Sequence, residues 1–173
     1  MKYLAVIPVF ALLTTSCIFH KAPAIPGALP EGAAKLLDQK YPGWQLAEFA
    51  PSSGDAACRD HAGKVPTMTS DDLNSDGIGD WVVEIHAADA VKLVIIMGWL
   101  NDYRLYEIES MSGDKAERSV ASAPRGTKYI NPTTKSDDYL SHNSAYTVSC
   151  AGDRIYYFWD GDGFQKVVPG PAK

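Results

Sequence analysis

The sequence predicts an α+β fold, in which one N-terminal helix packs on a mainly antiparallel β-sheet. Three observations favour this class. Apolar residues recur at helical spacing within residues 29–41, later segments have the apolar patterns of strands, and short turns rich in Asp, Asn and Gly join those segments. Strands and helices do not alternate along the chain, which argues against a parallel, doubly wound sheet. We expect a single domain over residues 29–173, a length that buries roughly two-thirds of the unfolded chain's surface.

The predicted helix covers residues 29–41. Pro30 suits the first turn, where its missing N–H is not needed, and Glu31 complements the positive end of the helix dipole. Pro42 and Gly43 end the helix. Its apolar face consists of Ala33, Leu36, Leu37 and Tyr41.

Alternating or continuously apolar segments predict strands from residue 44 onward. They cover residues 44–49, 81–86, 91–100, 103–108, 145–150, 155–159 and 164–168. The segment 91–100 is apolar on both faces, so we expect it in the centre of the sheet. Two further segments, 51–70 and 111–138, are polar and lack apolar periodicity, so we expect them to be long loops.

The composition and charge of the chain exclude several classes of protein. Hydrophobic residues make up 46% and charged residues 21%, which excludes a disordered chain, a collagen and a coiled coil. The net charge is −5 and no basic stripe is present, so we expect no nucleic-acid partner.

Residues 1–16 have the anatomy of a secretory signal peptide. Lys2 precedes an apolar run at 3–13, which small residues then close. The run is shorter than the roughly 20 residues that span a bilayer. We therefore expect an exported protein.

The end of this signal, Leu12-Leu13-Thr14-Thr15-Ser16-Cys17, resembles the lipobox of bacterial lipoproteins. The resemblance implies that Cys17 is lipidated, that residues 17–28 form a tether, and that the membrane is a partner through this lipid. Ile18 stands where inner-membrane retention favours Asp, so the resemblance implies the outer membrane of a Gram-negative host, facing the periplasm or the cell surface. Thr14 departs from the lipobox pattern, which favours Leu. The alternative is an ordinary signal cleaved near residues 22–24, with Cys17 removed.

The two remaining cysteines, Cys58 and Cys150, form an even pair in an exported protein. We expect a disulfide between them, which would stabilise the fold by roughly 4–5 kcal/mol in the chain-entropy model. The alternative is two separate buried thiols.

Residues 72–80 carry oxygen-bearing side chains at alternate positions, followed by Gly77 and a final Asp. Calcium takes six to eight oxygen ligands, and short side chains two residues apart can converge on one ion when the backbone curls around it. Glycine permits the sharp bend that this requires. The expected ligands are Asp72, Asn74, Asp76, the Ile78 carbonyl and Asp80.

This segment resembles the Asp-x-Asp-x-Asp-Gly-x-x-Asp calcium loop of FG-GAP and VCBS-type repeats and of dockerins. The resemblance covers nine residues and occurs once, so it implies a structural Ca²⁺ site and not a repeat architecture. The alternative is an acidic turn without metal, because Asp, Asn, Ser and Gly favour turns on their own.

Other candidate sites are weaker. Residues 160–163 favour a hairpin turn, the four histidines lack zinc-ligand spacing, and no Gly-x-Ser-x-Gly motif occurs. We therefore expect a non-enzymatic binding module of the envelope, whose partner is an envelope protein, a glycan or an enzyme that it inhibits. The alternatives are an envelope hydrolase built from the two long loops and a purely structural protein. His61 or His142 beside paired carboxylates would favour the hydrolase, and an aromatic patch on the late strands would favour the binding module.

Overall fold

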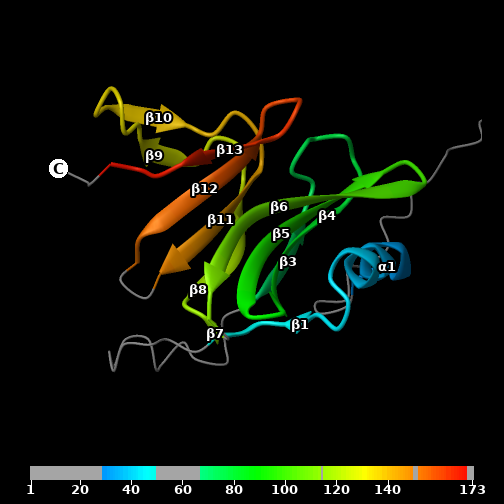
Figure 1. Cartoon of the computed structure of the whole chain (residues 1–173). Coiled ribbons are helices and arrows are strands. Elements are labelled where there is room, and N and C mark those ends of the chain that lie inside the picture. Colours follow the sequence, from blue (N-terminus) through cyan, green and yellow to red (C-terminus); the bar gives the residue numbers. More distant parts are fainter. Residues whose placement is uncertain (1–28, 50–66, 114, 150–151, 171–173) are drawn as a thin grey trace, which may run out of the picture.

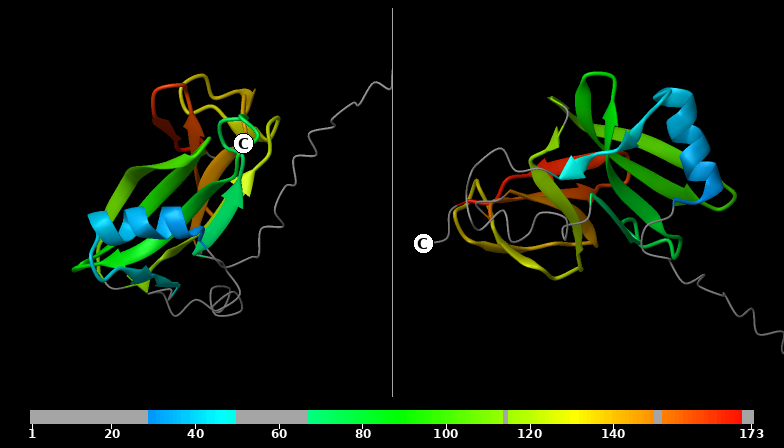
Figure 2. Two further views of the ribbon diagram at one scale, coloured as in Figure 1. Left: turned by 90° about the vertical axis from the view of Figure 1, so that its right-hand side faces the viewer. Right: turned by 90° about the horizontal axis from the view of Figure 1, so that it is seen from below.

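The computed structural model describes residues 29–49, 67–113, 115–149 and 152–170. Two antiparallel sheets face each other, and one helix covers the outer face of the first sheet (Figures 1 and 2). Within these described ranges, no helix is long and apolar enough to cross a membrane.

The helix α1 (Glu31–Lys40) confirms the helix predicted from the apolar spacing. Ala33 and Leu37 are fully buried and Tyr41 nearly so, against the first sheet. Lys40 lies in the last turn, where a cation complements the dipole, and Pro30 precedes the first turn. The buried stripe of α1 therefore fixes the helix on the sheet.

The first sheet has five strands, in the order β1-β4-β5-β6, with β3 also pairing with β4. All of these pairings are antiparallel. The strands are β1 (Gln45–Leu46), β3 (Met68–Asp71), β4 (Asp80–Ala87), β5 (Ala90–Trp99) and β6 (Asp102–Ser112). The strand β5 lies inside the sheet and is buried over most of its length, as its two-faced apolar sequence predicts.

The second sheet has four antiparallel strands, in the order β13-β12-β11-β8. Two small pairs complete the described structure: β9 with β10, and β2 with β7 in parallel. The strands outside the first sheet are β2 (Glu48–Phe49), β7 (Lys115–Ala116), β8 (Arg118–Ala123), β9 (Lys128–Ile130), β10 (Asp137–Tyr139), β11 (Ser144–Ser149), β12 (Arg154–Trp159) and β13 (Phe164–Val167).

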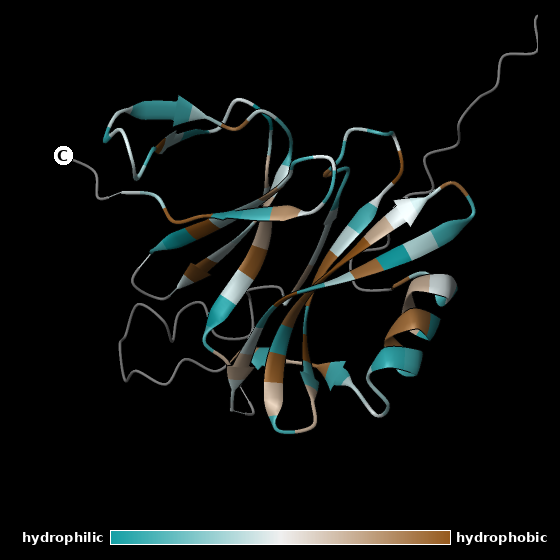
Figure 3. Ribbon diagram, turned by 45° about the horizontal axis from the view of Figure 1, so that its top comes forward, coloured by the Kyte–Doolittle hydropathy of each residue, from teal (hydrophilic) through white to brown (hydrophobic). Residues whose placement is uncertain are grey.

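Two apolar cores hold these layers together. One lies between the sheets and includes Leu93, Ile95, Val120 and Tyr157. The other lies between α1 and the first sheet. Hydrophobic and hydrophilic residues alternate along strands of both sheets, as Figure 3 shows. The first sheet is thus covered by apolar contacts on both of its faces.

The predicted α+β class is wrong. The structure is mostly β: 55% of the described residues lie in strands, and 8% lie in one short helix. The error arises in the segment 111–138, which we expected to be a loop and which contains the end of β6, strands β7 to β9 and the start of β10. The strand β8 consists mainly of Ser and Ala, which give little apolar periodicity. Its pairing with β11 supplies the burial that the sequence pattern does not indicate.

Candidate functional site

The two sheets leave open edges on the same side of the molecule. Among the described strands, β6 pairs only with β5, and β13 pairs only with β12. On the opposite side, β3 and β8 lie against each other. The space between the sheets is therefore closed at β3 and β8 and accessible between β6 and β13.

A β-bulge on β6 shapes this opening. Leu93 faces Glu109 and Val94 faces Glu107, so Ile108 is an extra residue in the strand. Such a bulge increases the local twist and re-aims side chains. Ile108 packs against the core between the sheets, and Glu109 reaches cations of the second sheet.

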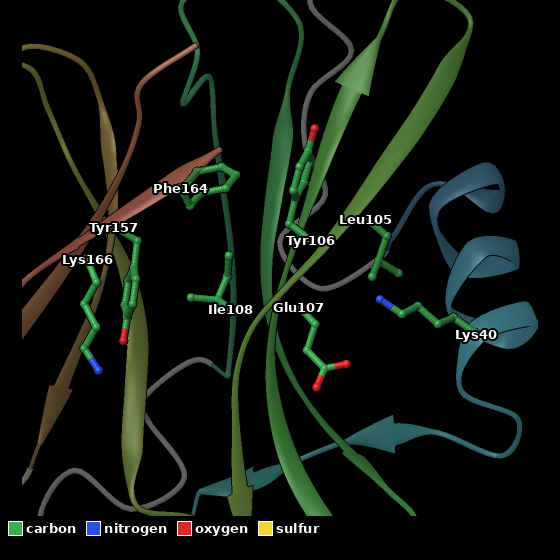
Figure 4. A pocket seen from close by; sticks show the side chains of 8 residues that line it. All are labelled: Lys40, Leu105, Tyr106, Glu107, Ile108, Tyr157, Phe164 and Lys166. Atoms are coloured by element: carbon green, nitrogen blue, oxygen red, sulfur yellow. The ribbon is translucent and has the colours of Figure 1, made fainter. Parts of the chain in front are cut away.

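A cleft of about 430 Å³ lies along this edge. Its lining residues come from α1, β6, β12 and β13 and are Lys40, Leu105, Tyr106, Glu107, Ile108, Tyr157, Phe164 and Lys166. Figure 4 shows Tyr106 and Ile108 on the side of β6 that faces Tyr157, Phe164 and Lys166, whereas Leu105 and Glu107 lie on the side of α1.

Aromatic side chains form the apolar wall of the cleft. The rings of Tyr106 and Phe164 lie 5.6 Å apart, edge to face, and join the two sheets. Trp159 packs edge to face on both, at 5.5 Å from Tyr106 and 5.3 Å from Phe164. These contacts hold the aromatic rings in one arrangement, so the wall is preformed for a ligand.

The charges of the cleft are partly paired. Glu107 accepts hydrogen bonds from Lys92 at 2.8 Å and from the Tyr41 hydroxyl at 2.5 Å, and these lower the pKa of the Glu107 carboxyl. Burial alone would raise the pKa of Glu109, but the hydrogen bond from Lys166 and the nearby Arg118 lower it. Both carboxylates are therefore ionised and held by cations.

A buried polar cluster lies behind the cleft. Glu84 on β4 is 0% exposed, and neither of its carboxyl oxygens has a hydrogen-bond partner among the described residues. Burial raises the pKa of Glu84 to about 8; the positive charge of Arg118 opposes this shift and the negative charge of Glu109 adds to it. The Tyr157 hydroxyl lies near Thr147 and Glu109 but makes no hydrogen bond of good geometry within the described part of the chain.

The first three predicted calcium ligands converge within one loop. The Asp72 carboxylate accepts the N–H groups of Asp76 at 3.1 Å and of Gly77 at 2.9 Å. The Asn74 side chain also accepts the Asp76 N–H at 3.1 Å and donates to the Asp76 carboxylate at 2.8 Å. Asp76 in turn accepts the N–H of Ile78 at 2.8 Å. Gly77 has φ +84°, as the predicted bend requires.

Asp80 makes its hydrogen bonds with backbone N–H groups and not with Asp72, Asn74 or Asp76. It is fully buried, and its two oxygens accept the N–H groups of Leu73 at 2.8 Å and of Gly98 at 2.9 Å. Burial raises the pKa of Asp80 to about 7, although both hydrogen bonds oppose the shift. Within residues 29–49, 67–113, 115–149 and 152–170, no three His, Cys, Asp or Glu side chains form a metal-binding group. Hydrogen bonds thus connect Asp72, Asn74 and Asp76 within the loop, whereas Asp80 connects the loop to β5.

The other predicted sites divide between turns and undescribed segments. Cys17, Cys58 and Cys150 lie outside the described residues. Asp160 accepts the N–H groups of Asp162 and Gly163 in the hairpin between β12 and β13, which confirms the predicted turn.

Comparisons of the chain with protein-family models, with curated proteins and with solved structures found no match.

The sequence patterns predict neither the cleft nor the buried cluster. One signal is present in the sequence: Glu84 stands between Val83 and Ile85 in an apolar strand, and acidic residues are rarely buried unless they are paired. The pairing of Tyr106 with Phe164 had no signal in the sequence, since these residues are brought together only when the two sheets pack.

Proposed function

We propose that this protein is an exported, lipid-anchored binding module of the bacterial envelope, and that its ligand site is the cleft between β6 and β13. The ligand we propose is an extended, acidic segment of another envelope protein. The observation that carries this proposal is the open edge of β6 beside a cleft with an aromatic wall.

The edge of β6 supplies the main-chain part of such a site. A strand at the edge of a sheet presents N–H and C=O groups to which another extended segment can add. In an added strand, alternate side chains point to opposite faces. Those on the inner face would enter the cleft and contact Tyr106 and Phe164, which supports specificity as well as attachment.

The charge of the cleft favours an acidic ligand. Together with the groups paired to them, the lining residues carry a net charge of +2, from Lys40, Lys92, Lys166 and Arg118 against Glu107 and Glu109, whereas the whole chain has a net charge of −5. A locally basic rim steers an acidic partner and disfavours a basic one. The rest of the acidic surface would repel the same ligand, so the cleft is the favoured point of contact.

The alternative hydrolase hypothesis has less support from the geometry. It required catalytic residues from two long loops, and one of these, 111–138, is largely built of strands. The other lies mostly in residues 50–66, outside the described part of the chain. Among the described residues, those that line the cleft include aromatic residues of β12 and β13, which supports the binding module.

Three further parts of the proposal come from the sequence. They are lipidation at Cys17, which would hold residues 17–28 as a tether at the outer membrane, a disulfide between Cys58 and Cys150, and a structural Ca²⁺ ion. We propose Asp72, Asn74, Asp76 and the Ile78 carbonyl as ligands of the ion. The convergence of the first three side chains supports this site, and each carboxylate oxygen retains acceptor capacity beside its N–H contact.

Calcium should raise the Tm of the protein relative to a chelator, by about 3 °C for each kcal/mol of binding free energy. Asp76→Ala should remove this shift, because it deletes a ligand at an exposed position. Asp162→Ala in the β12–β13 turn is the matched control and should retain it. Scanning calorimetry in calcium and in chelator measures the difference, and an equal Tm in both would contradict the calcium site.

Acidic decapeptides should bind the purified full chain more tightly than basic decapeptides of the same length. Lys166→Ala should weaken acidic peptides by about fivefold, because it removes a cation from the cleft. Lys135→Ala removes an exposed lysine outside the cleft and should have no effect. Fluorescence polarisation gives the affinities.

Hydrogen exchange supplies the second measurement in this experiment. Addition of a peptide strand should slow amide exchange along β6, since its outer edge would become hydrogen bonded. Peptide binding that leaves exchange in β6 unchanged, or that responds equally to Lys166→Ala and Lys135→Ala, would place the site elsewhere.

A further inference from the structure

The turn between β5 and β6 presents two large apolar side chains to solvent. Trp99 is 37% exposed and Leu100 is 85% exposed. Leu100 also has φ +36°, a backbone conformation that L-residues rarely adopt. The guanidinium of Arg104 lies 4.2 Å from the Trp99 ring and holds the indole in place. Leu100 thus combines a strained backbone conformation with an exposed apolar side chain, and packing within the fold does not explain this arrangement.

The N-terminal end of α1 lies at the same end of the molecule. A Cβ at Gly32 would lie only 2.6 and 2.8 Å from ring atoms of Tyr103, so the first turn of α1 rests directly on the start of β6 (Figure 1). Cys17 stands 12 residues before Leu29. A chain of that length spans at most roughly 40 Å when extended, and about 20 Å on average when flexible.

We propose that Trp99 and Leu100 insert into the headgroup region of the membrane that carries the N-terminal lipid. This inference rests on the lipid anchor of the proposed function. Trp residues are enriched at the membrane interface, where the indole ring is partly apolar and can donate a hydrogen bond. A lipid anchor is strengthened by a second membrane-binding element, and the tether keeps this turn within reach of the surface.

The charges around the turn indicate whether it binds an anionic or a zwitterionic lipid surface. Asp102 directly follows the turn as the first residue of β6. The loop of residues 72–80, with its carboxylates, is adjacent, because a Cβ at Gly98 would lie 2.6 Å from the Gly79 carbonyl oxygen. Arg104 is the cation stacked on Trp99. Since carboxylates are repelled by anionic lipid, we infer that the turn binds a zwitterionic surface.

The proposed membrane contact at Trp99 and Leu100 also determines where the cleft lies relative to the membrane. The first turn of α1 lies beside Tyr103, and its last turn carries Lys40 at the cleft. A ten-residue helix is about 15 Å long. The cleft would therefore open above the membrane surface, where a segment of another envelope protein can reach it.

Brominated lipids provide the test, because they quench tryptophan only at short range. The probe is a vesicle of brominated phosphatidylcholine that carries the full mature chain purified from the envelope with its lipid. The wild-type emission should be partly quenched, and Trp99→Phe should remove most of that quenching. Trp159→Phe, which alters a tryptophan of the aromatic wall, should retain it. Leu100→Asp alters a highly exposed side chain and should lower the quenching at least twofold without lowering the Tm.

The intact mass of the same sample separates the two hypotheses. A lipidated protein whose quenching is unaffected by Trp99→Phe and Leu100→Asp would overturn the membrane contact and leave the anchor in place. A mass without the lipid would refute the anchor, and the membrane contact would be refuted with it. Quenching that is stronger in anionic vesicles than in phosphatidylcholine would overturn the inferred preference for a zwitterionic surface.

Discussion

Replacing Glu84 by glutamine should make the protein more stable than wild type above pH 8. At pH 5 the variant and the wild type should have nearly the same free energy of unfolding. Burial raises the pKa of the folded Glu84 carboxyl to about 8, from 4.5 in the unfolded chain. Between these values the folded state holds a proton that the unfolded state releases. Stability that is fully present below pH 4.5 is therefore lost as the pH rises through 8. The loss is on the order of 3–5 kcal/mol.

The amide side chain that Glu84→Gln introduces cannot ionise, so this loss should be absent from the variant. Urea unfolding at pH 5 and pH 9 measures the free energies of unfolding, and the difference between wild type and variant isolates this carboxyl from other titrating groups. The charged neighbours Arg118 and Glu109 are retained in both proteins. Glu117→Gln, at an exposed position, is the matched control and should change stability equally at the two pH values. Parallel pH profiles for wild type and Glu84→Gln would show that Glu84 ionises normally.

Asp80→Ala should destabilise the protein by about 3 kcal/mol. The Asp80 carboxylate accepts two buried backbone N–H groups, those of Leu73 and Gly98. Loss of the carboxylate leaves both donors without a partner in the interior, and each such group costs about 1–3 kcal/mol. Leu73 is part of the core between the sheets, so its displacement would also loosen that core.

The same variant separates a structural carboxylate from a metal ligand. The destabilisation should be present in excess chelator, because the hydrogen bonds of Asp80 do not involve an ion. Asp80→Asn keeps one acceptor oxygen and should lose less stability than Asp80→Ala. Urea unfolding with and without chelator provides the comparison. A destabilisation that appears only when calcium is present would show that Asp80 acts through the ion.

Local signals were sufficient for the helix and for the core of the first sheet. The apolar stripe that ends at Tyr41 predicted α1 to within two residues at each end, and the continuous apolar run of β5 predicted a central strand. The strand predicted at 103–108 extends to Ser112 in the structure. The prediction ended too early because the bulge at Ile108 shifts the alternation of apolar and polar residues by one position. A change of phase of this kind hides the second half of a strand from any pattern with a period of two.

The second sheet depended on context that no local pattern contains. In β8, only Val120 is strongly apolar, and its neighbours are Ser and Ala. Ser119 and Ala123 are buried, and Ala121 and Ser122 half-buried, because β11 pairs with this strand and the first sheet packs over it. The candidate cleft has the same origin, since Tyr106 and Phe164 are 58 positions apart and meet only across the open edges of the sheets.

The bend at Gly77 was predicted correctly, but the partners of Asp80 were not predictable. Asp80 stands at the final acidic position of the pattern, which favours a ligand. Its actual contacts, with Leu73 and Gly98, require that β5 pack beside the loop. A carboxylate can satisfy either a cation or backbone N–H groups, and the sequence pattern is the same for both.

The close approach of Gly98 to the loop of residues 72–80 links the two sites that we propose, the Ca²⁺ loop and the turn at Trp99. A Cβ at this position would lie 2.5 Å from the Ile78 side chain and 2.6 Å from the Gly79 carbonyl oxygen, so the strand and the loop touch backbone to backbone. A contact this close leaves no room for an intervening side chain that could absorb a displacement. Trp99 is the next residue along the strand. Any stiffening of the loop would therefore be transmitted to the turn at Trp99, and the Ca²⁺ ion that we propose for the loop would set how rigidly that turn is presented.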